Sequence, residues 1–248
     1  MKKNVILWSG GKDSTATIIL AHLKQQEISE ILFTEVMYDN RRGISGELPE
    51  HIHFIKKVAK PLFEEWGFPV TIISAETDYI THFNRIIERP IKHMEHKGKS
   101  FGFPPGKMCA IRRDCKIKPA AMYLNNKYGT GGYMQFLGIC ADEESRLASL
   151  HRAGHRSLLA EYGFTQQDAK DLCESFGLLS PYYDFSKRGG CWMCLYARPL
   201  EHAQIKRYYP EAWEEFVSLE SRTDLAFSRW NPFGDTLKER DQKLNQYM

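Results

Sequence analysis

The chain has 248 residues, 42% of them hydrophobic, which is enough for one α/β domain with an elaboration or for two small domains. Its 34 lysines and arginines nearly balance its 31 aspartates and glutamates, which excludes a protein that binds polyanions through its overall charge; any nucleic-acid contact must come from a local patch. The first apolar run is too short for a signal peptide and no run of about 18 apolar residues occurs, so we expect a cytoplasmic protein with no membrane partner.

The first predicted elements are a short buried strand at residues 5–7 and a helix at 15–24, separated by the sequence Ser-Gly-Gly-Lys-Asp-Ser at 9–14. Two glycines between a strand and a helix let backbone N–H groups point at an anion at the helix N-terminus. A Walker A loop is excluded, because Ile6 stands where its first glycine is needed and Asp13 where its Ser or Thr is needed. The three spaced glycines of the dinucleotide fingerprint are also absent. The stretch is interpreted as a phosphate cradle, the alternative being an ordinary Gly-Gly turn.

Strands and helices are predicted to alternate along the rest of the chain. Buried apolar runs predict strands, and apolar residues spaced three or four apart predict helices. We expect a strand at 30–38, a helix at 51–66, a strand at 68–74, a helix at 79–96, an irregular Gly/Pro loop at 97–107, a helix at 119–127, a strand at 133–139, helices within 158–177, a short strand at 178–184 and a helical region at 200–219.

This alternation predicts an α/β fold with a mostly parallel sheet flanked by helices. We expect a nucleotide-binding domain at residues 1–185 and a helical, cysteine-bearing C-terminal part at 186–248. Polar residues 39–43 follow the second strand, at the kind of strand end where open parallel sheets bind ligands.

Four of the six cysteines form two close pairs, Cys109 with Cys115 and Cys191 with Cys194. Four thiolates suit a tetrahedral zinc or a 4Fe-4S cluster, and a glycine pair before Cys191 would let the backbone approach a cluster. The alternative is that the cysteines pack as small hydrophobic residues. Cys140, after a predicted strand, is either a sulfur carrier or a packed thiol, and Cys173 is assigned to the core.

Basic residues surround both cysteine pairs and are predicted to bind an anionic nucleotide or nucleic acid if the pairs converge. The alternative is that they are solvated loop side chains. No catalytic histidine is predicted, because the histidines lack a metal-ligand or nucleophile spacing. The predicted substrate-binding residues are Arg112, Arg113, Lys116, Lys118, Arg146, Lys187 and Arg188.

Residues 9–14, directly after a strand, resemble the PP-loop of the ATP pyrophosphatase superfamily, whose members cleave ATP between the α- and β-phosphates. Residues 47–50 (Glu-Leu-Pro-Glu) and 138–146 resemble the phosphoadenosine phosphosulfate (PAPS) reductases of that superfamily, although Cys140 stands where that family often has arginine. Both cysteine motifs resemble those of the iron–sulfur enzymes of DNA phosphorothioation, which are PAPS reductase-like, and this resemblance spans roughly residues 4–200. It implies a Rossmann-like fold of the adenine nucleotide α hydrolase type.

The resemblance also implies an ATP-dependent sulfur transferase. ATP phosphates would lie on Ser9, Gly10, Gly11 and Ser14, with Lys12 neutralising the leaving pyrophosphate and Asp13 holding the loop or Mg²⁺. Lys12 and Asp13 are the expected catalytic residues. A substrate oxygen would be adenylated, and sulfur from sulfide or a donor protein would displace AMP. Cys109, Cys115, Cys191 and Cys194 would hold a 4Fe-4S cluster, or alternatively Zn²⁺.

Two other functions stay open. One is a sulfonucleotide reductase, but no cysteine follows Cys194 to act as the nucleophile that those enzymes carry near their C-terminus. The other is a non-catalytic nucleotide-binding protein with a structural zinc, which the retained loop at 9–14 disfavours. The acceptor is a DNA backbone, a tRNA base or a small metabolite, and no oligomeric state is predicted.

Overall fold

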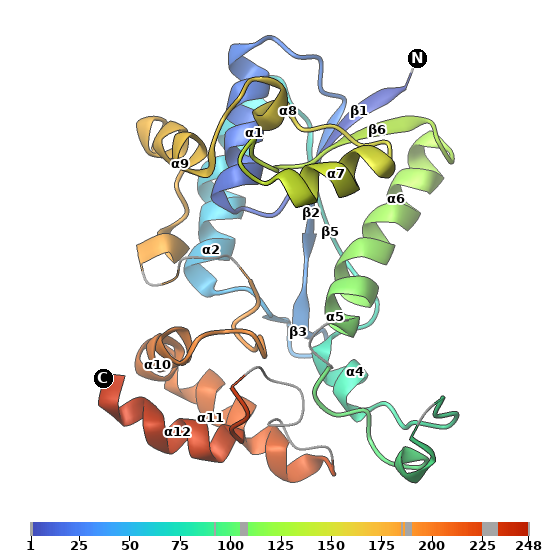
Figure 1. Ribbon diagram of the computed structural model, residues 1–248, viewed down its shortest axis with the longest axis vertical. Coiled ribbons are helices and arrows are strands. Elements are labelled where there is room, and N and C mark those ends of the chain that lie inside the picture. Colours follow the sequence, from blue (N-terminus) through green and yellow to red (C-terminus); the bar gives the residue numbers. More distant parts are fainter. Residues whose placement is uncertain are drawn as a thin grey trace. The chain divides into compact units, whose positions relative to one another are not determined.

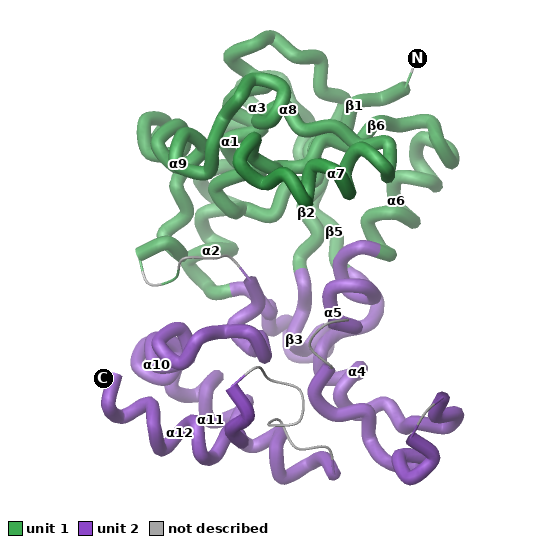
Figure 2. Tube along the Cα trace, in the orientation of Figure 1, with its two compact units in different colours: residues 1–35, 48–74, 118–189 green, residues 36–47, 75–117, 190–248 purple. Residues whose placement is uncertain are grey.

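The computed structural model describes residues 2–91, 93–104, 109–184, 186, 190–224 and 233–247. The chain divides into two compact units, coloured separately in Figure 2. Unit 1 comprises residues 1–35, 48–74 and 118–189, and unit 2 comprises 36–47, 75–117 and 190–248. The sequence had suggested a single division at residue 185, whereas unit 2 also includes two stretches from the first half of the chain. None of the described helices is long and apolar enough to cross a membrane.

A four-stranded parallel sheet forms the centre of unit 1. Its strands are β1 (Lys3–Trp8), β2 (Glu30–Glu35), β5 (Val70–Ser74) and β6 (Tyr133–Phe136), in the order β5-β2-β1-β6. In register, Ile6 faces Ile31 of β2 and Phe136 of β6. The central strand β2 is buried along its whole length, as expected for a parallel strand covered on both faces. The predicted α/β class is confirmed.

Alternate residues of the central strands point to two separate hydrophobic layers. Ile6 and Phe33 pack in the larger layer, whereas Val5 and Leu32 pack in a smaller layer with Leu124. Helices therefore cover both faces of the sheet, as Figure 1 shows. The helices of unit 1 are α1 (Lys12–Leu23), α2 (Pro49–His53), which continues through a π-helical turn (Phe54–Ala59) into α3 (Lys60–Glu65), α6 (Lys118–Tyr128), α7 (Glu144–Arg152), α8 (Leu158–Glu161) and α9 (Gln166–Ser175).

Glu30, the first residue of β2, is fully buried and joins the sheet to α6. Its Oε1 accepts hydrogen bonds from Thr71 (2.5 Å), Tyr123 (2.7 Å) and Lys127 (2.9 Å), and its Oε2 accepts one from Tyr128 (2.8 Å). Burial alone would raise the pKa of Glu30, but these hydrogen bonds lower it below its usual value. A buried carboxylate with this many donors fixes α6 against β2 and β5.

Unit 2 is mainly helical. A hairpin of β3 (Met37–Asp39) and β4 (Ile44–Ser45) is its only described strand pair. Phe216 is buried in it, and the buried rings of Phe103, Trp192 and Trp213 each pack edge to face against Phe216. Its helices are α4 (Tyr79–Asn84), α5 (Ala110–Arg112), which runs into a π-helical turn (Arg113–Ile117), α10 (Pro199–Tyr208), α11 (Pro210–Ser218) and α12 (Leu237–Leu244), with 3-10 turns at Met94–His96, Leu219–Arg222 and Asn245–Tyr247.

Three predicted elements were wrong in part. The strand expected at 30–38 is divided, because the chain leaves unit 1 after Glu35 and continues as β3 in unit 2. The helix expected at 79–96 ends at Asn84, since Arg85 is extended and Ile86 forms an antiparallel bridge with Ser100. The strand expected at 178–184 contains a 3-10 turn, Pro181–Asp184. The other predicted strands and helices are present with shifted ends.

Candidate functional site

The stretch at residues 9–14 forms a tight turn from β1 into the N-terminus of α1. Gly10 has a φ of +75°, a left-handed conformation that favours glycine. A Cβ at Gly10 would lie 2.5 Å from Cε1 of His51 and 2.8 Å from Cδ1 of Ile55, so a side chain has no room there. The chain passes directly over α2 at this point, and the first turn of α1 follows immediately.

Short hydrogen bonds hold the loop closed. Ser14 Oγ accepts the backbone N–H of Ser9 (3.1 Å) and donates to the carbonyl of Gly11 (3.0 Å), and the two serine hydroxyls lie 3.0 Å apart. Nζ of Lys12 lies 2.5 Å from Oδ1 of Asp13 and donates to the carbonyl of Gln166 at 3.2 Å. The residues predicted to bind ATP therefore surround the start of α1, where backbone N–H groups and the helix dipole favour an anion.

Three residues beyond the predicted set pack against this loop. A Cβ at Gly138 would lie 2.5 Å from both the carbonyl carbon of Asp13 and the nitrogen of Ser14, so this glycine lets the chain after β6 touch the loop backbone. The buried thiol of Cys140 donates to Oδ1 of Asp13 at 3.4 Å, and burial raises its pKa far above the usual value. The thiol of Cys173 donates to the carbonyl of Lys12 at 3.2 Å. Both cysteines are buried supports of the loop.

His51 and Tyr183 also contact the loop, and no sequence pattern pointed to either. His51 is 2% exposed; its Nδ1 hydrogen-bonds Ser180 (2.7 Å) and its Nε2 lies 3.3 Å from the carbonyl of Ser9. The hydroxyl of Tyr183 accepts the backbone N–H of Lys12 at 2.9 Å. His51 and Tyr183 are far in sequence from the residues that they contact, so the local spacing of residues could not predict these contacts.

The four predicted metal ligands all belong to unit 2. Cys109, Cys191 and Cys194 are partly exposed, whereas Cys115 is fully buried. The first three lie close enough to influence one another: burial raises the pKa of Cys109 and of Cys191, and the charge of Cys194 raises both further. Burial and the carboxylates of Asp114 and Asp78 raise the pKa of Cys115 to about 12, with a smaller contribution from Cys109.

Ser45 and Gly46, at the end of the β3–β4 hairpin, hold the second cysteine pair in place. The backbone N–H of Trp192 donates to the carbonyl of Gly46, and its indole N–H donates to the carbonyl of Ser45. The N–H of Cys194 donates to the carbonyl of Cys191, which closes a turn between the two cysteines. A Cβ at Gly46 would lie 2.6 Å from the methyl group of Met193, so the turn packs closely on the β3–β4 hairpin.

The spacing of the cysteines bears on the kind of metal. A tetrahedral zinc with Zn–S bonds of about 2.3 Å places its sulfurs roughly 3.8 Å apart. Among the described residues, which include all six cysteines, the only three potential ligands within 4.8 Å of one another are those of His93, Glu95 and His96. No three of the six cysteine sulfurs therefore lie within 4.8 Å of one another.

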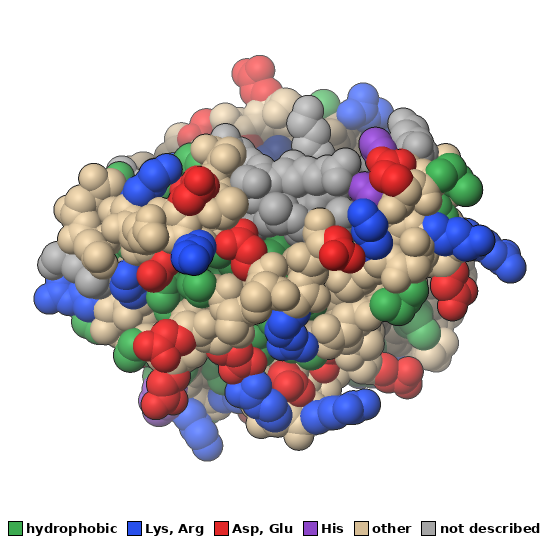
Figure 3. All heavy atoms as spheres, turned by 90° about the horizontal axis from the view of Figure 1, so that it is seen from below, with side chains coloured by type: hydrophobic (Ala, Val, Ile, Leu, Met, Phe, Trp, Pro, Cys, Tyr) green, Lys and Arg blue, Asp and Glu red, His purple; other side chains and the backbone are tan. Residues whose placement is uncertain are grey.

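The described residues among the predicted substrate-binding cations belong to both units. Arg113 forms a bidentate pair with Asp114, and Arg146 is paired with Glu143. Lys116 lies near enough to Cys191 to lower its pKa. Lys118 and Arg146 belong to unit 1, Arg112, Arg113 and Lys116 belong to unit 2, and Lys187 and Arg188 lie outside the described residues. On the face shown in Figure 3, basic and acidic side chains are interspersed.

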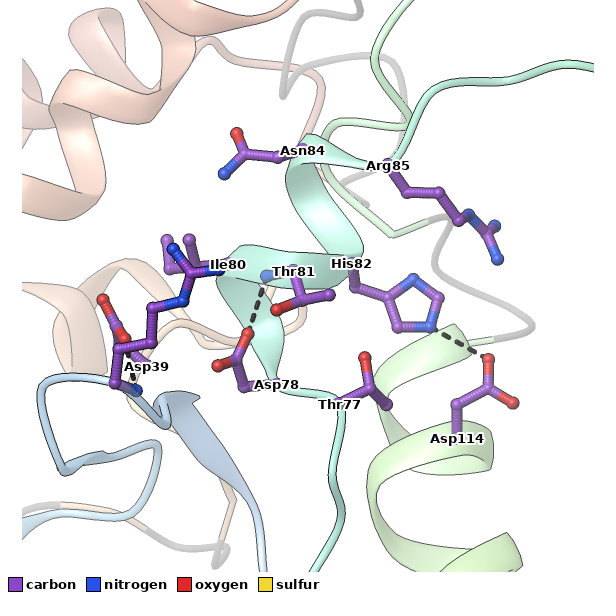
Figure 4. Close-up of a pocket in the computed structure, with 10 residues that line it drawn as sticks. Asp39, Thr77, Asp78, Ile80, Thr81, His82, Asn84, Arg85 and Asp114 are labelled. Atoms are coloured by element: carbon purple, nitrogen blue, oxygen red, sulfur yellow. Dashed lines mark hydrogen bonds and ion pairs between the residues drawn. The ribbon is translucent and has the colours of Figure 1, made fainter.

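A pocket of about 570 Å³ lies within unit 2 and is lined in part by Asp78 and Asp114. Figure 4 shows its wall at α4, where His82 Nε2 points to Asp114 Oδ2 at 2.9 Å. Asp78 caps α4 by accepting the N–H of Thr81 (2.6 Å) and also accepts the N–H of Asn40 (2.7 Å). Asp39, Arg41 and Arg85 complete the charged lining.

The fold and these residues define an α/β protein with a Gly-Gly loop between β1 and α1 and a group of cysteines in unit 2. No protein-family model matches the chain, and no curated protein matches it. Among solved structures, the chain is similar to the U34-tRNA thiolase NcsA from Methanococcus maripaludis with its [4Fe-4S] cluster, with a TM-score of 0.41, 14% sequence identity and coverage of 98% of this chain and 73% of that chain.

Proposed function

We propose that the protein is an ATP pyrophosphatase of the PP-loop superfamily that transfers sulfur to an adenylated substrate. The loop carries this proposal: Gly10 is in a left-handed conformation, the N-cap residue of α1 is a glycine, and serine hydroxyls lie on the same turn, a combination suited to phosphate oxygens. It lies after the first strand of a parallel sheet, where open sheets bind ligands.

In the proposed reaction, an oxygen of the acceptor attacks the α-phosphorus of ATP. The new oxygen–phosphorus bond forms as the bond between the α-phosphorus and the bridging oxygen breaks, and pyrophosphate leaves. Lys12 stabilises the negative charge that grows on the pyrophosphate, and the N–H groups at the start of α1 hold its oxygens. The side chain of Asp13 is 26% exposed, so Asp13 can bind Mg²⁺ while it stays paired with Lys12. A sulfur nucleophile then displaces AMP from the acceptor.

The cysteines of unit 2 support the sulfur-transfer part of the proposal. Cys109, Cys191 and Cys194 have the exposure and mutual proximity to bind a 4Fe-4S cluster, with Cys115 as the fourth ligand of the predicted set. Such a cluster would supply a site that binds the incoming sulfur. The protein's own contribution is to hold Cys191 and Cys194 on a turn packed against the β3–β4 hairpin.

Pyrophosphate release from ATP tests the nucleotide half of the proposal. We expect Lys12→Ala to abolish release, and Asp13→Asn to reduce it at least ~100-fold, since both remove charge from the reacting groups. Lys170→Ala is the control, because Lys170 is a surface residue of the same unit that pairs only with Glu174 among the described residues. If both loop variants release pyrophosphate at the wild-type rate, the loop is not the reaction site.

Iron, zinc and sulfide analysis of anaerobically purified protein tests the other half. We expect about four irons and four sulfides per chain, and loss of both in a Cys191→Ser/Cys194→Ser variant that still binds nucleotide. One zinc per chain without the visible absorption of a cluster would replace the sulfur-transfer proposal by a structural-zinc function.

A further inference from the structure

Helix α1 lacks an N-terminal cap of its own, and a residue far along the chain provides one. Its N-cap residue, Gly11, has no side chain to accept the N–H groups of the first turn. The hydroxyl oxygen of Tyr183 accepts the N–H of Lys12 at 2.9 Å. This oxygen also lies over Gly11, because a Cβ there would be 3.3 Å from it. Tyr183 therefore occupies a backbone amide of the type that binds a phosphate oxygen.

The turn that carries Tyr183 is fixed to the other side of the same loop. The N–H of Tyr183 donates to the carbonyl of Ser180 at 3.0 Å, and the hydroxyl of Ser180 hydrogen-bonds Nδ1 of His51 at 2.7 Å. His51 in turn lies beneath Gly10 and 3.3 Å from the carbonyl of Ser9. One buried histidine thus connects the turn at 180–183 to the phosphate-cradle loop. All of these residues belong to unit 1.

We propose that Tyr183 is a gate of the nucleotide site: its hydroxyl holds the Lys12 amide in the free protein and gives it up to a phosphate oxygen when ATP binds. This inference rests on the proposed function, because it assumes that the loop binds ATP. One amide proton cannot make two good hydrogen bonds, so tyrosine and phosphate compete for it. The phosphate wins the competition because a charged acceptor forms a bond about twice as strong as a neutral one.

The chemical state of Tyr183 fits this exchange. Burial raises the pKa of Tyr183 to about 12, so the side chain stays a neutral hydroxyl at physiological pH. A neutral gate does not repel the incoming phosphate, and it satisfies an amide that would otherwise be left without an acceptor. When the hydroxyl leaves, its O–H can bond to water.

The effect of removing the hydroxyl follows from the exchange. Tyr183→Phe deletes a hydrogen bond that exists only in the free protein, so ATP no longer has to break it. The net value of one neutral hydrogen bond corresponds to an affinity gain of about 2- to 12-fold. The same deletion should lower the unfolding temperature of the free protein and leave that of the nucleotide-saturated protein unchanged. A residue that simply supports the loop would instead weaken binding when it is altered.

The experiment measures binding of α,β-methylene-ATP, which cannot be cleaved at the α–β bridge, by calorimetry to the full-length wild type, Tyr183→Phe and Tyr162→Phe. Tyr162 is the matched control, since it lies in the same unit, is 49% exposed and makes a cation–π contact with Lys24 away from the loop. The thermal unfolding of each protein is recorded with and without the analogue.

Tighter binding by Tyr183→Phe, with an unfolding temperature lowered only in the free protein, supports the gate. Equal or weaker binding than the wild type overturns it, while the proposed function stands. If neither protein binds the analogue, both the gate and the proposed function are wrong. If the analogue binds but the wild type releases no pyrophosphate from ATP, the proposed reaction fails and the gate is judged on the binding result alone.

Discussion

Replacement of Gly10 by alanine tests whether the loop is built as described. Alanine at a φ of +75° costs about 1–2 kcal/mol, because an L-residue is strained in the left-handed region. The added Cβ would also lie 2.5 Å from Cε1 of His51 and 2.8 Å from Cδ1 of Ile55, and crowding of this kind in a packed interior costs about 1–3 kcal/mol. We therefore expect the free energy of unfolding to fall by about 2–5 kcal/mol.

Gly67 provides a matched control for the strain. Its φ of +86° is similar, but a Cβ there would have no neighbour within 4 Å. Gly67→Ala should therefore lose only about 1–2 kcal/mol. Urea unfolding measures both variants, and the difference between them isolates the crowding at Gly10. The double variant Gly10→Ala/His51→Ala should lose less stability than the sum of the losses of the two single variants. The reason is that removal of the imidazole makes room for the new methyl group.

The same variant connects the loop's geometry to nucleotide binding. A shift of Gly10 away from His51 moves the N–H groups at the start of α1, so we expect Gly10→Ala to bind α,β-methylene-ATP at least ~10-fold more weakly. Gly67→Ala should bind it like the wild type. Equal stability of Gly10→Ala and Gly67→Ala would refute the packing argument, and unchanged nucleotide binding in Gly10→Ala would refute the placement of the phosphates.

The remaining predictions concern Glu30 and the thiols. Glu30→Gln should lower the free energy of unfolding by about 2–3 kcal/mol, since it weakens the charged hydrogen bonds from Lys127 and its neighbours. The folded-state pKa of Glu30 lies below its usual value of 4.5. The contribution of Glu30 to the free energy of unfolding is therefore fully present above pH 4.5 and is lost as the pH falls through the folded-state pKa. Unfolding at a series of pH values should show that the stability of Glu30→Gln falls less over that range than the stability of the wild type. In metal-free native protein, iodoacetamide should modify Cys109 and Cys194 well before the fully buried Cys115, Cys140 and Cys173, as read by peptide mass spectrometry. Rapid modification of Cys140 would instead support the hypothesis that this residue is a sulfur carrier.

The sheet and the start of α1 could be predicted because they depend on local patterns. A buried apolar run, two glycines and a helical period occur within the first two dozen residues, and each signal is contained in its own stretch. The same reasoning identified the strand at 70–74 and the helix at 118–128, with errors of a few residues at their ends.

The contacts around the loop could not be predicted, because they join residues that are distant in sequence. Tyr183 meets Lys12, His51 meets Ser180, and Gly138 meets Asp13 only after the sheet has formed. The helix at Ala110–Arg112 was missed because its apolar residues are too few to show a period. The metal ligands and the substrate-binding cations stay predictions.

The interleaved order of the two units has a consequence for how the protein is made. All four strands of the sheet and the loop lie within the first 136 residues, whereas the second cysteine pair enters unit 2 through its last segment, which begins at residue 190. On the ribosome, the nucleotide-binding sheet can therefore form before the cysteines of unit 2 are all present. A metal centre that joins Cys115 to Cys191 would close a long chain loop. Loop closure of this length lowers the conformational entropy of the unfolded chain by an amount equivalent to about 4–5 kcal/mol. Insertion of the metal would then be the last step of maturation, and a chain cut short before residue 190 would retain the sheet without that closure.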